Sequence, residues 1–123
     1  MTKEREMLWI ALGIFLLAAC GGAYLTVLLA QDKKIPWSIT LLHGVLGALG
    51  LTLLLVSALS VGAFGAVWMA TIIFVCAALG GLLNLLIHLR KGRPVLPIAL
   101  IHGVVAVIGA VVLVYAIVTA SPS

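Results

Sequence analysis

The stretch ITLLHGVLGALGLTLL, residues 39–54, recurs as IALIHGVVAVIGAVVL, residues 98–113, and this pair decides the fold. His43 and His102 hold the same place in two copies of one internal repeat, with an ungapped offset of 59 positions (102 − 43). Residues of the first copy that are identical in the second are Trp9, Ala11, Ile14, Phe15, Ala18, Ala19, Gly21, Gly22, Ile39, Leu41, His43, Gly44, Val45, Gly50 and Leu54. An apolar composition alone rarely pairs Trp with Trp and His-Gly with His-Gly in one register. The chain therefore contains two related halves, about 8–60 and about 67–119.

The composition is that of an integral membrane protein. Of the 123 residues, 65% are hydrophobic and 8% are charged, and the mean hydropathy is +1.40. All Lys, Arg, Asp and Glu residues lie in three short segments: 3–6, 32–34 and 90–93. The apolar stretches between them exceed the roughly 20 helical residues that cross a bilayer. We expect one all-α domain over residues 1–123, a transmembrane four-helix bundle with helices at about Leu8–Ala30, Trp37–Ser60, Gly62–Leu89 and Val95–Ala120.

Each half is expected to form a helical hairpin. Because each copy has an even number of spans, both hairpins insert the same way up and are related by a pseudo-two-fold axis along the membrane normal. The uncharged junction Ser57–Gly65 is expected to be a minimal turn.

The net charge of +4 belongs to helix ends and does not indicate nucleic-acid binding. Loops 31–36 and 90–94 carry most of the basic residues, which favours a cytoplasmic position for both loops in a multi-pass protein of the bacterial inner membrane.

The segment Leu17-Ala18-Ala19-Cys20 is similar to the cleavage site of a bacterial lipoprotein signal. The apolar run continues past Cys20 through Ala30, and the glycine pair after Cys20 has a counterpart in Gly80 and Gly81. We therefore expect the first helix to be a permanent span.

The two histidines are expected at one depth of the membrane. Each lies roughly seven residues into its helix, about 10 Å from the same surface at 1.5 Å per residue. Closing the first hairpin brings Gly21 and Gly22 level with His43, and the second brings Gly80 and Gly81 level with His102. Two opposed imidazoles supply axial ligands for one haem b, and glycines leave flat surface for the macrocycle. Gly47 and Gly50 lie on the same helical face as His43, and Gly109 lies on the same face as His102. All three are expected to widen the space between the helices that the macrocycle would occupy.

The segments from His43 to Gly50 and from His102 to Gly109 share the pattern His-Gly-x-x-small-x-x-Gly, where x is any residue. With four apolar helices, this pattern resembles the small bacterial b-type membrane cytochromes. The resemblance implies a haem-binding electron-transfer protein with His43 and His102 as metal ligands. It also implies a partner: a larger redox complex, a second copy of the chain, or quinone.

Alternatives remain at the sequence level. The chain could be a cofactor-free accessory or assembly subunit, a protein that holds a bare metal, or a binder of a chlorophyll-type pigment. His88 is expected near the membrane interface, either bonding a propionate or quinone or without a ligand, and Asn84 is expected to bond a neighbouring helix. No Asp, Glu, Lys or Arg lies within a span, which argues against an ion-coupled transporter. Nothing in the sequence indicates independent enzymatic activity.

Overall fold

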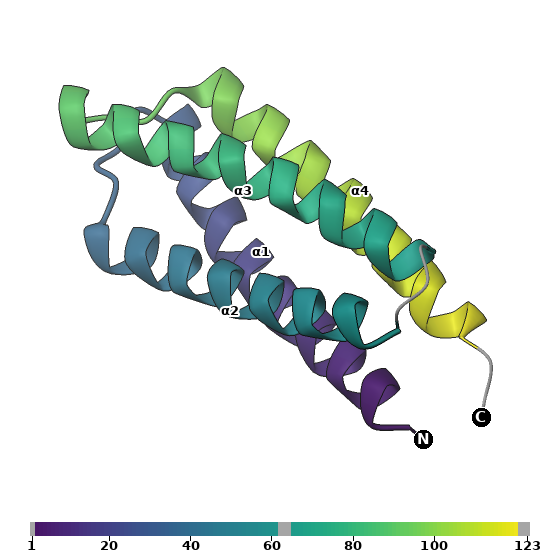
Figure 1. Ribbon diagram of the computed structural model, residues 1–123. Helices are drawn as coiled ribbons and strands as arrows, with labels where there is room; N and C mark the ends of the chain where they lie inside the picture. Colours follow the sequence, from purple (N-terminus) through teal and green to yellow (C-terminus); the bar gives the residue numbers. More distant parts are fainter. Residues whose placement is uncertain (1, 62–64, 121–123) are drawn as a thin grey trace.

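The computed structural model describes residues 2–61 and 65–120, and this part of the chain forms four α-helices (Figure 1). Their bounds are α1 Lys3–Ala30, α2 Trp37–Val61, α3 Ala66–Lys91 and α4 Leu96–Thr119. Each helix is long and apolar enough to cross a membrane. The all-α, membrane-spanning four-helix prediction is therefore confirmed.

Local chemistry explains where the helices begin and end. α1 begins at Lys3, earlier than the predicted Leu8, because the Thr2 hydroxyl caps it by accepting a hydrogen bond from the Arg5 N–H. α3 extends to Lys91 and stops at Gly92, which has a left-handed backbone with φ of 79°. The predicted start of the third helix at Gly62, and most of the predicted turn Ser57–Gly65 beyond α2, lie outside the described residues.

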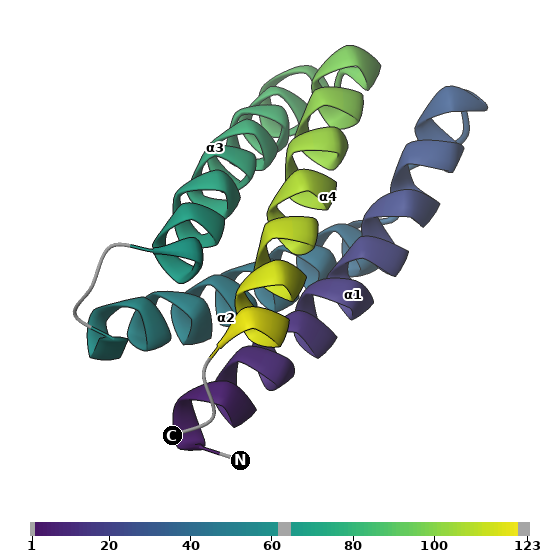
Figure 2. The same cartoon turned by 90° about the vertical axis from the view of Figure 1, so that its right-hand side faces the viewer.

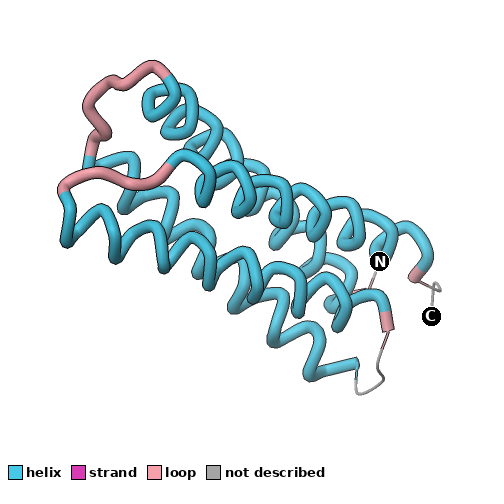
Figure 3. Tube along the Cα trace, turned by 90° about the horizontal axis from the view of Figure 1, so that it is seen from above, coloured by secondary structure: helices cyan, strands magenta, loops and turns pink. Residues whose placement is uncertain are grey.

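Neighbouring helices are antiparallel, and the four helices pack in the cyclic order α1, α2, α3, α4. α1 packs beside α2 and α4, and α3 packs beside the same two helices. Figure 2 shows α3 and α4 running side by side. Consequently α1 faces α3 across one diagonal of the bundle, and α2 faces α4 across the other. Figure 3 shows the two described loops at one end and both termini near the other; we call these the loop end and the terminal end.

The apolar core is concentrated in the half of the bundle nearest the terminal end. It includes the pair Phe15 and Phe74, whose rings stack across the α1–α3 diagonal with centroids 3.8 Å apart and planes 2° apart. The buried residues packed with this pair are Leu8, Ala11, Leu12, Leu54, Ala70, Leu113 and Ile117. This half of the molecule is held by close apolar packing.

Polar contacts to the backbone hold the loop end. Arg93 donates hydrogen bonds to the carbonyl oxygens of Leu29 at 3.1 Å and Lys33 at 3.0 Å, and it pairs with Asp32 at 3.1 Å. The guanidinium therefore ties the second loop to the last turn of α1, where free helix carbonyls need donors. The buried side chain of Asn84 exchanges two hydrogen bonds with the backbone of Val95, just before α4.

The core predicts opposite effects for two glycines of α2. A Cβ on Gly50 would lie 2.9 Å from the Phe15 ring, whereas nothing lies within 4 Å of a Cβ on Gly47. We expect Gly50→Ala to lower the free energy of unfolding by about 1–3 kcal/mol through overpacking. Gly47→Ala should leave it unchanged or raise it slightly, because alanine favours the helix by about 1 kcal/mol. Unfolding by SDS in mixed micelles measures both, and equal stabilities would contradict this packing.

Candidate functional site

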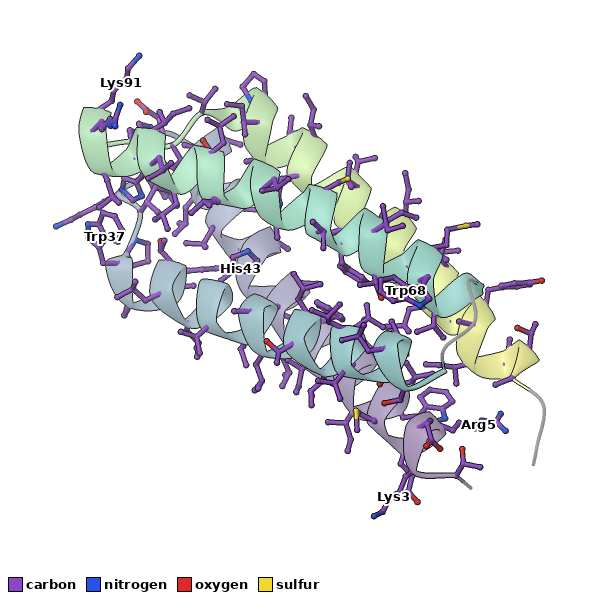
Figure 4. All side chains as sticks on the ribbon, in the orientation of Figure 1. Lys3, Arg5, Trp37, His43, Trp68 and Lys91 are labelled. Carbon is purple, nitrogen blue, oxygen red and sulfur yellow. The ribbon has the colours of Figure 1, made fainter. Side chains whose placement is uncertain are left out.

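The structure brings His43 of α2 and His102 of α4 together across the bundle. Their ring centroids are 5.9 Å apart and their planes are nearly perpendicular, at 88°. Figure 4 places His43 between the two ends of the bundle, on the side of α2 that faces the other helices. The pair spans the α2–α4 diagonal, as the phenylalanine pair spans the other one.

Both imidazoles are oriented by the same hydrogen bond. Nδ1 of His43 lies 2.7 Å from the carbonyl oxygen of Ala18 on α1, and Nδ1 of His102 lies 2.6 Å from that of Ala77 on α3. A carbonyl oxygen only accepts, so Nδ1 must carry the proton and donate it. In the neutral ring, Nε2 then keeps its lone pair. Among the described residues, neither Nε2 has a hydrogen-bond partner.

The paired glycines let each imidazole lie directly against the neighbouring helix. A Cβ on Gly22 would lie 2.9 Å from Cε1 of His43, and a Cβ on Gly81 would lie 2.9 Å from Cε1 of His102. Gly21 and Gly80 lie beside the histidine Cβ atoms, at an ordinary contact distance of 3.7 Å. In this structure Gly22 and Gly81 therefore lie against the imidazole of their own hairpin, Gly21 and Gly80 lie beside the Cβ of the same histidine, and the contact of all four with a macrocycle stays a prediction.

The other three predicted glycines do not share one environment. Gly50 contacts the ring of Phe15, and Gly109 contacts the ring of Phe74, so both support the apolar core toward the terminal end. Gly47 lies between His43 and Gly50 on the same face of α2, and a Cβ at Gly47 would have no neighbouring atom within 4 Å. Of these three glycines, only Gly47 leaves open space, and it does so on the face of α2 that carries His43.

Packing is looser at the level of the histidines than at the level of the phenylalanines. Phe15 and Phe74 are buried, with 8% and 6% of their surface exposed. His43, His102 and the four glycines beside them are only half-buried. The histidine level is therefore more exposed than the level of the two phenylalanines.

His88 lies apart from this pair, in the last turns of α3. It is expected near the interface, either bonding a propionate or quinone or without a ligand. In the structure its side chain is buried and stacks on Trp37, with ring centroids 4.2 Å apart and planes 7° apart. Asn84 is expected to bond a neighbouring helix. Its side chain bonds the backbone of Val95, the N-cap residue of α4. No three metal-ligating side chains come together anywhere in residues 2–61 and 65–120, so the geometry gives a three-histidine metal site no support.

The sequence analysis missed the acceptors of the two imidazoles. A backbone carbonyl has no sequence signature of its own, and Ala18 and Ala77 were noted only as identical repeat positions. The signal available was their separation from the histidines, 25 residues in both hairpins. The Arg93 contacts with α1 were also missed, because they join segments about 60 residues apart.

The hydrogen bonds predict the same tautomer at both histidines. In ¹⁵N-histidine-labelled protein, we expect Nδ1 of both His43 and His102 to carry a proton that is hydrogen-bonded to a carbonyl oxygen. Gly22→Ala should displace the His43 ring and weaken this bond, because its Cβ would overlap Cε1. Gly21→Ala is the matched control, since its Cβ fits at contact distance. Protons on Nε2 of both rings in the wild-type spectrum would contradict the arrangement.

Comparison with known proteins does not identify a family for this chain. The chain matches no family model, no curated protein and no solved structure. Its function is therefore argued from its own residues.

Proposed function

We propose that this chain is a small b-type membrane cytochrome that holds one haem between His43 and His102. The observation that carries the proposal is the pair of imidazoles whose centroids lie 5.9 Å apart across the bundle, each held through Nδ1 and neither with a hydrogen-bond partner at Nε2 among the described residues. Histidines that bind metals donate their other ring N–H to a backbone carbonyl or carboxylate in the same way.

The spacing of the rings fits two axial ligands of one metal ion. A metal–imidazole bond of roughly 2 Å puts a ring centre about 3 Å from the metal, so two opposed rings have centres about 6 Å apart. The centroids of His43 and His102 are 5.9 Å apart. The distance also suits a direct contact between two imidazoles, and the experiment below separates these cases.

The surroundings support a flat apolar ligand. The histidine level is half-buried, the glycines there carry no side chains, and the open position at Gly47 lies on the same stripe. α2 and α4 face each other across the diagonal without close backbone contact. A macrocycle between the two rings would meet the backbones of α1 and α3 at its edges.

When bound, haem supplies one-electron chemistry. The chain supplies the two imidazoles, their orientation through Ala18 and Ala77, and an apolar, water-poor setting. The described helices offer no further reacting groups around the pair, so we propose electron transfer with quinone, or as a subunit of a larger redox complex.

We place the protein in a bacterial inner membrane with its loop end in the cytoplasm, on the basis of the basic residues there. The pseudo-two-fold relation between the hairpins is part of this proposal. It is supported by the matching contacts of His43 with Ala18 and Gly22, and of His102 with Ala77 and Gly81.

Replacing either ligand should remove the haem. We expect His43→Ala and His102→Ala, expressed in haem-replete cells and purified in detergent, to contain less than about a tenth of the wild-type haem, because one imidazole holds the metal far less firmly than two. Pyridine-haemochrome absorbance per protein measures the content. His88→Ala is the matched control and should retain haem.

Rescue separates ligation from a structural role. His43→Gly with free imidazole in the buffer should recover a low-spin haem spectrum, since the small ligand can occupy the vacated position. Full haem retention in both alanine variants would refute the assignment. Wild-type protein that folds and never binds haem would favour the cofactor-free accessory subunit.

A further inference from the structure

A hollow at the loop end has a chemistry that the haem proposal does not use. It has a volume of about 640 Å³ and is lined by Tyr24, Lys33, Lys34 and Trp37, together with apolar residues of the first loop. Trp37 has one ring face stacked on His88 but is still 42% exposed, and Tyr24 is 53% exposed. Two aromatic residues and two lysines thus line one hollow where a span meets the loop.

A second, separate hollow lies between α1 and α2. It has a volume of about 470 Å³ and has one lining residue, Tyr24, in common with the first. Its lining is apolar apart from Tyr24 and His43, and Gly21 also lines it. We call the two neighbouring hollows together the furrow: the first is lined by two lysines, and the second is almost entirely apolar.

The charge of this end is not compensated by the protein. Arg93 is occupied by Asp32 and by the carbonyl oxygens of Leu29 and Lys33. Asp32 is the only carboxylate in the loop-end segments, and within the described residues Lys33 and Lys34 form no ion pair. An anion in the first hollow would meet these two uncompensated ammonium groups.

These features occur in the first hairpin only. At the repeat positions of Tyr24, Trp37 and Lys33, the second hairpin has Leu83, Leu96 and Gly92. Arg93, the counterpart of Lys34, turns inward onto α1. The furrow is therefore not a by-product of the duplicated hairpin.

We infer that this furrow binds an anionic phospholipid. Its phosphate lies between Lys33 and Lys34, its glycerol region lies beside Tyr24 and Trp37, and one acyl chain lies in the apolar hollow between α1 and α2. Basic residues at a membrane surface attract anionic headgroups, and amphipathic aromatic rings prefer the same depth. The apolar hollow between α1 and α2 favours a lipid over free phosphate, because free phosphate has no apolar part that could occupy it. The inference does not depend on haem.

Native mass spectrometry of the delipidated, detergent-solubilised protein tests this inference. With equal amounts of dioleoyl-phosphatidylglycerol and dioleoyl-phosphatidylcholine, we expect the first bound lipid to be phosphatidylglycerol by roughly fivefold or more, the effect of one fully effective lysine. The double variant Lys33→Gln/Lys34→Gln should lose this preference. The matched control Arg90→Gln/Lys91→Gln removes the same charge at the same end and should keep it.

Several outcomes would overturn the inference. Equal loss in both double variants would indicate diffuse attraction to the basic end, and no preference in the wild type would exclude a selective site. Displacement of the lipid by inorganic phosphate, at ionic strength matched with sodium chloride, would indicate a phosphate site. Displacement by ubiquinone-10 would make a quinone the occupant. Loss of the preference in haem-free His102→Ala would contradict the statement that lipid binding does not depend on haem, whereas retained preference in that variant is the expected result.

Discussion

The structure depends on one hydrogen bond that is made twice: an imidazole Nδ1–H donating to a backbone carbonyl of the partner helix in its hairpin. Inside a bilayer no water is present to satisfy a ring N–H, so a histidine there must find a protein acceptor. Ala18 and Ala77 provide it, and the glycine four residues later lets the ring approach. The bond fixes the register of each hairpin and leaves Nε2 directed elsewhere.

Different contacts hold the helices together at the two ends of the bundle. Toward the terminal end, the stacked phenylalanines and their buried neighbours form a close-packed core. Beyond the histidines, Arg93, Asn84 and the Trp37–His88 stack connect the helices through specific polar and aromatic contacts. The half-buried histidine level lies between these two rigid regions. At that level the two histidine–carbonyl hydrogen bonds join the helices of each hairpin.

Sequence was sufficient for the coarse architecture. The apolar stretches and confined charges predicted four membrane-spanning helices, with bounds that differ by a few residues where a cap such as Thr2 extends a helix. The helical periodicity and the loop position also predicted that Gly21 and Gly22 would lie level with His43. The carbonyl of Ala18 and the Arg93 contacts were not predictable, because backbone acceptors leave no residue pattern and long-range contacts depend on packing geometry. The burial of His88 under Trp37 was missed for the same reason.

The central claim is that the two imidazoles are axial ligands of one haem. The visible absorption spectrum of the wild-type protein, purified in detergent from haem-replete cells and recorded before and after dithionite reduction, tests it most directly. The account predicts a sharp Soret band, with resolved α and β bands on reduction, at one haem per chain. A featureless spectrum from folded protein, or a high-spin spectrum, would contradict bis-histidine ligation.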